Sequence, residues 1–415
     1  MSRNTPAWSP WRTIAWFGLV SLAADMVYEG ARSITGPYLA ALGASALAVG
    51  VITGTGEAAA LAFRLVSGPM ADRSGRYWSL TILGYALTAI CVPLLALAPF
   101  LGAAGLAFAA ALVILERTGK AIRSPAKSAL LARAAKPVGR GRGIAVHKAL
   151  DQVGAFAGPL VVAGVIALTA RTWPAFVVLA VPGAVAMVLL VVLRARTGGD
   201  SEGSPSPTTA PAAGDGRSPG PDGPAEDTRL PPDFYRFALA CAANTLGLMT
   251  FGLISFHLVE ADLVPLAAVP LVYAAAMAIE AVAALGTGFA YDRWGGRVLY
   301  LVPVLVASVP WLTLSTDVAA VAVGILVWGS AMGILDSTVK ALVADLVPQA
   351  RLATAYGVFA AFQGVGALLG GAVAGWLYAG SRLDLVAVLG IAQVFGLLLL
   401  VSVLRDQPRR RARVG

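Results

Sequence analysis

The sequence GPMADRSGR occupies positions 68–76, between two long apolar segments. A related sequence, GFAYDRWGGR, occupies positions 288–297 in the same setting, about half a chain length later. Each is a short turn that carries Asp and Arg where one apolar segment ends and the next begins. Recurrence at this interval is most simply explained by a duplicated unit. The sequence therefore predicts two pseudo-symmetric halves.

The composition is typical of a polytopic α-helical membrane protein. Hydrophobic residues make up 58% of the chain and charged residues 13%, and the mean hydropathy is +0.77. These values argue against a soluble enzyme. Cys91 and Cys241 both lie in apolar segments, which excludes a disulfide framework and a four-cysteine zinc site. His147 and His257 lack a third ligand at a recognisable spacing, so we expect neither a metal nor another cofactor.

Twelve apolar segments reach the ~20 residues that a helix needs to cross the hydrocarbon layer. Their expected limits are 12–41, 46–70, 77–98, 101–127, 141–169, 173–194, 234–260, 265–290, 298–316, 318–344, 352–379 and 384–404. The first segment continues past Asp25 without a cleavage site, so it is expected to be a retained span rather than a signal peptide. The predicted fold class is an all-α membrane protein with twelve transmembrane helices in two six-helix halves.

The halves are expected to cover residues 1–196 and 233–405. Residues 197–232 between them are rich in Gly, Pro, Ser and Asp and show no apolar periodicity. This composition predicts a disordered linker. Residues 406–415 form a basic tail.

The distribution of Lys and Arg predicts the orientation in the membrane. One side of the predicted spans carries Arg3, Arg12, Arg73, Arg76, Arg133, Lys136, Arg140, Arg142, Arg293, Arg297, Arg351 and the arginines of the tail. The other side carries only Arg171 and Arg382. We therefore expect both termini and the linker to be cytoplasmic, in a protein of the cytoplasmic (inner) membrane that is a monomer. The net charge of +9 reflects this topology and contact with the lipid bilayer, not nucleic-acid binding.

The pattern G-x-x-x-D-R-x-G-R after the second span resembles the loop signature of the major facilitator superfamily. It is carried by Gly68, Asp72, Arg73, Gly75 and Arg76. In that family the Asp caps a helix end and pairs across the halves, while the Arg anchors the inner face, so the resemblance assigns these roles to Asp72, Arg73 and Arg76. The second copy carries Asp292 and Arg293, but Gly296 stands where an Arg would align.

Charged residues inside the spans are the candidates for function, because a charge at bilayer depth is costly unless it is paired or lines a wet cavity. In the first span Asp25, Glu29 and Arg32 share one helix face. The other candidates in the first half are Glu57, Arg64, Glu116, Arg117, Lys120, Arg123, Lys127, Lys148 and Asp151. Together they predict a central acidic site above an inner layer of mixed charge.

Asp25, Glu29 and Glu57 are the predicted protonation site, since three carboxyls near the midplane cannot all ionise cheaply. Arg32, Arg64, Glu116, Arg117 and Lys120 are predicted to line the same cavity. Two alternatives stay open. Glu29 and Arg32 could form an ion pair whose only role is to let the first span insert into the membrane. Arg123 and Lys127 could extend toward lipid headgroups.

A cytoplasmic gate is expected by resemblance, because superfamily members close this side by bringing spans four and five against spans ten and eleven. The gate residues would be Arg123, Lys148 and Asp151 in the first half and Glu280, Asp336 and Lys340 in the second. Asp336 is predicted to pair with Lys148 or Arg123 when the cavity opens outward. Alternatively, Asp336 and Lys340 form a pair within one helix.

The sequence GAFAGP at positions 154–159 resembles the antiporter signature G-x-x-x-G-P of proton-driven exporters in the superfamily. Gly154 and Gly158 would let a neighbouring helix approach and Pro159 would bend the span; ordinary close packing is the alternative. The favoured function is proton-coupled export of a small organic amphipathic compound, with protons and this compound as the partners. Proton-coupled uptake of an organic anion is the alternative, and a non-transporting receptor or an enzyme is a remote one.

Overall fold

The computed structural model describes residues 8–197, 230–347 and 351–414. Within these ranges the secondary structure is helical, and twelve helical segments are long and apolar enough to cross a membrane. This confirms the predicted fold class. The predicted linker lies largely outside the described residues, as does Arg3.

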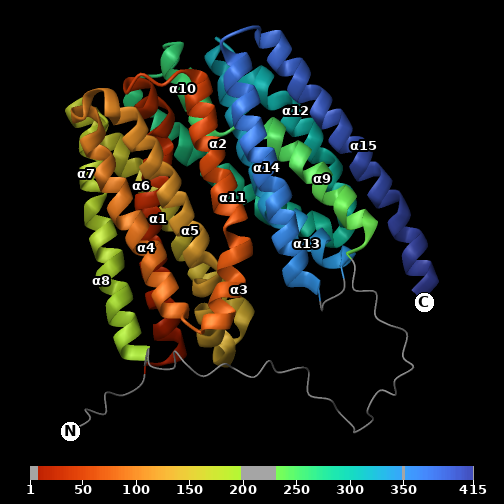
Figure 1. The fold of residues 1–415 in the computed structure, drawn as a ribbon. Coiled ribbons are helices and arrows are strands. Elements are labelled where there is room, and N and C mark those ends of the chain that lie inside the picture. The colour runs from red at the N-terminus through yellow and green to blue at the C-terminus, as the bar shows by residue number, and fades with distance from the viewer. Residues whose placement is uncertain (1–7, 198–229, 348–350, 415) are drawn as a thin grey trace, which may run out of the picture.

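The first half comprises α1 to α8 and the second α9 to α15 (Figure 1). The first-half helices are α1 (Pro10–Ala41), α2 (Ala46–Ala62), α3 (Arg64–Ser74), α4 (Tyr77–Leu94), α5 (Gly105–Ala135), α6 (Arg140–Thr169), α7 (Trp173–Val178) and α8 (Ala180–Thr197). The second-half helices are α9 (Pro232–Leu248), α10 (Phe251–Glu260), α11 (Val269–Trp294), α12 (Leu301–Thr313), α13 (Val318–Leu346), α14 (Leu352–Tyr378) and α15 (Arg382–Val414).

Several spans are built from two helices, and the break between α9 and α10 is the one that matters for the cavity. Met249 joins them with a φ of 57°, a left-handed conformation that non-glycine residues rarely adopt. Thr250 then starts α10, where its side chain accepts a hydrogen bond from the amide of Leu253. Discontinuous helices of this kind line the binding sites of many transporters, and Met249 and Thr250 both line the central cavity of this protein.

Glycines set the closest helix contacts. A Cβ on Gly154 or Gly158 of α6 would overlap the backbone of α1 at Leu22 and Met26 respectively. Between the halves, α2 packs along α14, where Gly50 and Gly371 bring the two backbones together. Small residues permit this approach in a membrane, where packing replaces the hydrophobic effect.

The signature loops contain glycines for a backbone reason. Gly75 ends α3 with a φ of 66°, and Gly295 ends α11 with a φ of 61°. Both conformations favour glycine. Asp72 accepts a 2.9 Å hydrogen bond from the hydroxyl of Tyr77, a residue of the same half. The side chain of Asp292 is not described.

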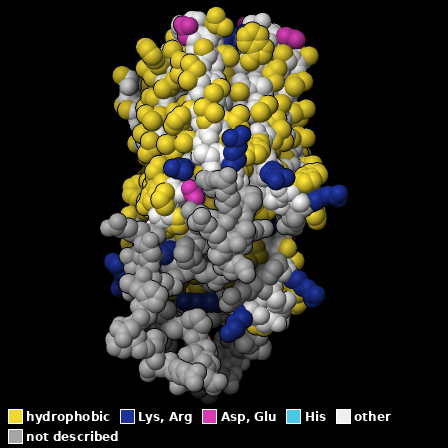
Figure 2. All heavy atoms as spheres, turned by 90° about the vertical axis from the view of Figure 1, so that its right-hand side faces the viewer, with side chains coloured by type: hydrophobic (Ala, Val, Ile, Leu, Met, Phe, Trp, Pro, Cys, Tyr) yellow, Lys and Arg dark blue, Asp and Glu magenta, His cyan; other side chains and the backbone are white. Residues whose placement is uncertain are grey.

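The outer surface carries a broad hydrophobic belt, and Lys and Arg gather toward one end of the bundle (Figure 2). That end, where α1 begins and α8 ends, includes Arg12, Arg73, Arg133 and Arg194, and is called the basic end below. At the opposite end, Gly36 of α1 packs against Gly252 of α10 across the halves. Lys148 lines the central cavity, its side chain is 63% exposed, and it lies near the start of α6 at the basic end, so solvent reaches the cavity from this end.

Candidate substrate cavity

A cavity of about 350 Å³ lies between the two halves, within the size range of small-molecule sites. Its first-half wall carries the predicted residues Asp25, Glu29, Arg32, Glu57, Arg64, Lys120, Arg123, Lys127, Lys148 and Asp151. Its second-half wall carries Thr245, Leu248, Met249, Thr250, Met277, Glu280, Trp328, Met332, Leu335, Asp336 and Gln363. Helices from both halves thus contribute side chains to one site.

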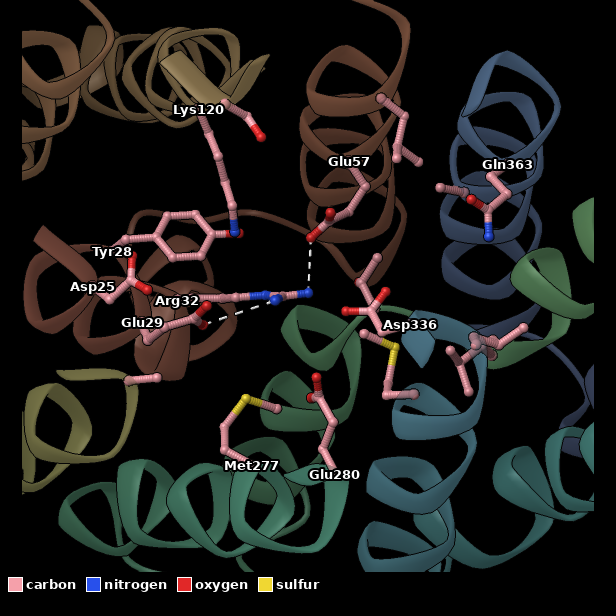
Figure 3. Close-up of a pocket in the computed structure, with 18 of the residues that line it drawn as sticks. Asp25, Tyr28, Glu29, Arg32, Glu57, Lys120, Met277, Glu280, Asp336 and Gln363 are labelled. Atoms are coloured by element: carbon pink, nitrogen blue, oxygen red, sulfur yellow. Dashed lines mark hydrogen bonds and ion pairs between the residues drawn. The ribbon is translucent and has the colours of Figure 1, made fainter. Parts of the chain in front are cut away.

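Arg32 is the centre of an ion-pair network at the far end of the cavity. Its Nη2 lies 2.9 Å from Oε1 of Glu57, and its Nη1 lies 3.8 Å from Oε2 of Glu29 (Figure 3). Arg117 lies 3.4 Å from the same oxygen of Glu57. Glu57 on α2 therefore joins α1 and α5 through two arginines. The Glu29–Arg32 pair within α1 exists, but it is part of a larger network.

Two polar contacts join the halves beside this network. The hydroxyl of Tyr273 on α11 donates a 2.5 Å hydrogen bond to Oε2 of Glu29. The hydroxyls of Thr53 on α2 and Thr250 lie 2.7 Å apart. Any rocking of one half against the other must change these contacts, because each joins residues of different halves.

Glu116 and Arg117 lie behind the cavity lining and are both buried. Glu116 accepts a 3.0 Å hydrogen bond from Thr88, whose oxygen in turn accepts a 2.7 Å bond from Arg123. Arg117 lies 3.8 Å from Glu116. Both residues therefore support the cavity wall, and only Arg123 of this group also faces the cavity.

Asp25 on α1 and Asp151 on α6 both line the cavity and lie close enough to interact with one another. Two neighbouring carboxyl groups repel one another when both are ionised, so a proton shared between them stabilises the pair. Lys148 lies 2.7 Å from Oδ2 of Asp151. The close approach that Gly154 and Gly158 permit between α1 and α6 brings the two acids together.

A second buried network lies on the basic-end side of this acid pair. Ser21 contacts Nε2 of His147 at 2.9 Å and the hydroxyl of Tyr85 at 3.1 Å, and it accepts a 3.1 Å hydrogen bond from Lys127. His147 is thus held within a polar cluster formed by four helices, α1, α4, α5 and α6. Lys127 points into the bundle here rather than toward headgroups.

Sequence reasoning missed several cavity residues. The cavity-lining Tyr28, Trp328 and three methionines read as ordinary core residues in apolar segments. So does Tyr273, which is buried beside the lining and contacts Glu29. Asp151 was expected at the gate, and its contact with Asp25 depends on how α1 packs on α6. The side chain of Lys340 is not described, whereas Asp336 lies in the cavity wall and takes part in an electrostatic interaction.

Among the described residues no group of three or more metal-ligating side chains forms a metal site. The cavity instead offers carboxyl groups, guanidinium groups and ammonium groups at its surface. These can bind charged or polar parts of a small molecule and exchange protons with water.

Comparisons with known proteins agree with this architecture. The family model described as Major Facilitator Superfamily matches residues 16–309 and 237–415. Proteins of Mycobacterium tuberculosis and Mycobacterium bovis, both described as uncharacterised, are 49% identical over 399 residues, which cover 96% of this chain and 94% of each relative.

Solved structures show the same fold at low sequence identity. The nucleoside transporter NupG is 14% identical with a TM-score of 0.72, over 95% of this chain and 99% of that one. A bacterial homologue of the lysosomal transporter Spinster, in an inward-facing conformation, is 16% identical with a TM-score of 0.67, over 98% and 99%. A POT family transporter in complex with 5-aminolevulinic acid is 12% identical with a TM-score of 0.71, over 96% of both chains. The chain belongs to the major facilitator superfamily and is a membrane transporter.

Proposed function

We propose that this transporter couples the movement of a small organic compound to protons, and that it works as an exporter that exchanges the compound for protons. The basic end is cytoplasmic in this proposal, as the positive-inside rule favours. The described conformation is then open to the cytoplasm. The transport cycle would rock the two halves about the cavity.

The contact between Asp25 and Asp151 is the observation that carries the proposal. A proton-coupled carrier needs a group that gains and loses a proton at the cavity, and a pair of carboxyls that shares one proton is such a group. Glu29 and Glu57 face Arg32 instead, which neutralises their charge in this conformation. The coupling site therefore centres on Asp25 and Asp151, with Glu29 and Glu57 as its neighbours.

Antiport follows if proton and compound cannot occupy the site together. The resemblance of Gly154, Gly158 and Pro159 to the antiporter signature supports the same direction.

Uptake of an organic anion is the second candidate function. It is favoured by the cationic side chains of the first-half wall, four of which have no carboxylate at ion-pair distance among the described residues. The direction of the proton-driven flux distinguishes it from export, since both functions use the same coupling site.

The test uses proteoliposomes that contain a pH-sensitive dye and a panel of small organic compounds that includes nucleosides and short peptides. Compound-dependent proton movement is expected with the wild type. Asp25→Asn and Asp151→Asn should each reduce it at least tenfold while compound exchange without a pH gradient persists, because the translocation path is intact. Glu260→Gln, an exposed acid at the end of α10, is the control and should behave as the wild type.

Transport that responds to a sodium gradient and leaves the lumenal pH unchanged would contradict the proposal. So would full proton coupling in both asparagine variants. Asp25→Glu keeps the carboxyl group and should retain part of the coupling, which separates loss of the proton site from misfolding.

A further inference from the structure

The two walls of the cavity differ in charge. All six described cationic residues of the lining belong to the first half, and both described charged residues of the second-half wall, Glu280 and Asp336, are acids. Figure 3 shows the same arrangement, with Lys120 and Arg32 extending from one side and Glu280 and Asp336 from the other. The first-half wall also carries four acids, Asp25, Glu29, Glu57 and Asp151, so its six cations leave it with an excess of positive charge, whereas the described charges of the second-half wall are negative.

Four cations of the first-half wall lack a carboxylate within ion-pair distance among the described residues. Lys120 lies over the ring of Tyr28 at 3.6 Å and Arg123 over that of Tyr85 at 4.7 Å. Lys127 donates to a hydroxyl. The Nε of Arg64 is buried without any hydrogen-bond partner. Such groups can accept an anion without first breaking an ion pair.

Glu280 is the complementary group on the opposite wall. It lies on α11 one helical turn after Met277, and it forms no hydrogen bond or ion pair with any side chain that the structure describes. A half-buried carboxylate of this kind is costly unless a cation joins it. Asp336 lies on the same wall and adds to its negative charge.

Apolar and aromatic side chains also line the cavity. Trp328, Met249, Met277 and Met332 line the second-half wall, and the ring of Tyr28 lies on the first. Methionine and aromatic side chains accommodate hydrophobic bodies of varied shape. The site thus combines cationic side chains, apolar side chains and an acidic group without a described partner.

We propose that the cargo is a small zwitterionic compound, whose anionic group lies against Arg64, Lys120, Arg123 and Lys127 and whose cationic group lies against Glu280. This inference rests on the proposed transport function and names its substrate class. A simple anion would leave Glu280 without a counter-ion, and a simple cation would leave the cationic wall without one. Both would be bound more weakly, because each leaves half-buried charge uncompensated.

The test compares compounds that share one skeleton and differ only in charge. Suitable sets are 6-aminohexanoic acid, hexanoic acid and hexylamine, together with dipeptides such as Phe-Ala, N-acetyl-Phe-Ala and Phe-Ala-amide. Affinity is measured by isothermal titration on the purified protein, and compound-dependent proton movement is measured in proteoliposomes. In the wild type the zwitterion of a set is expected to bind at least tenfold more tightly than its matched anion and cation.

Glu280→Gln should remove this preference by weakening zwitterion binding at least tenfold, to the level of the matched anion, without weakening the anion itself. Unchanged binding of the anion shows that the variant is folded. Glu260→Gln should keep the wild-type preference.

Tightest binding of anions or cations in every set, or a zwitterion preference that survives in Glu280→Gln, would overturn the inference. If anions or cations drive proton movement and zwitterions do not, the proposed function stands and only the substrate class is wrong. If no compound of any charge class binds or moves protons, both fail.

Discussion

At the scale of residues, Asp336 and Lys148 are the candidates for a gate at the basic end. Asp336 and Lys148 lie on opposite walls of the cavity, within electrostatic influence of each other, while the cavity is open toward the basic end. We propose that they pair when this end closes. Lys148 is bound to Asp151 in the described conformation, so the closing step would exchange one carboxylate partner for another.

Asp336→Asn should therefore destabilise the closed basic end and raise the population open toward it. The measurement is the labelling rate of Gln363→Cys in the cavity by an impermeant thiol reagent added from the basic-end side, and this rate should increase severalfold. Charge reversal of both partners, Asp336→Lys with Lys148→Asp, should recover part of the wild-type rate. An unchanged rate in Asp336→Asn would leave the pairing of Asp336 with Lys340 as the remaining explanation.

The sequence predicted the individual acids better than their partners. Asp25, Glu29 and Arg32 share a face because their spacing follows the helical period, and all three line the cavity. The contact of Asp25 with Asp151 joins positions more than a hundred residues apart. It depends on the packing of α6 on α1, which one sequence does not specify. Tyr273 was not predicted for the same reason, since its neighbours in the sequence do not distinguish it from a tyrosine of the hydrophobic core.

At the scale of elements, glycines on α6 decide whether the acid pair can form. The structure predicts that Gly154→Ala separates α6 from α1, because an added Cβ meets the backbone of α1 at Leu22. Overpacking of this kind costs about 1–3 kcal/mol. The variant should therefore unfold at a lower temperature and lose proton coupling, measured by thermal unfolding and by dye-loaded proteoliposomes.

Gly164→Ala is the matched control, since it lies on the same helix and a Cβ there meets nothing within 4 Å. It should leave unfolding and coupling at wild-type values. If both variants behave alike, close packing at Gly154 has no special role, and the resemblance to the antiporter signature carries no functional weight.

Helix limits followed from hydropathy, but breaks inside spans did not. The predicted spans 46–70 and 234–260 each contain two helices, α2 with α3 and α9 with α10. The apolar pattern continues through Phe63 and Met249, so it gives no signal of a break. The break at Met249 is held by a tertiary contact rather than by a local sequence preference, because the carbonyl of Met249 accepts a 3.3 Å hydrogen bond from Trp328.

At the scale of the whole molecule, the two halves meet through few polar contacts and through glycine-lined packing. Two of these contacts are the hydrogen bonds of Thr53 with Thr250 and of Tyr273 with Glu29. Each stabilises the described conformation by about 0.5–3 kcal/mol, which is weak enough for the bond to break in each transport cycle. The packing of α2 on α14 stabilises the closed end. Protonation of Asp25 and Asp151 therefore needs to change the free-energy difference between the two conformations by only a comparable amount.

The most direct test of proton coupling is the reversal point of transport in proteoliposomes whose membrane potential is clamped to zero. A transported compound identified from the panel is placed at set concentrations on both sides, and a known pH difference is imposed. Obligatory exchange with one proton predicts that the concentration ratio at which net flux stops shifts about tenfold for each pH unit. A ratio that stays at one whatever the pH difference would contradict the account.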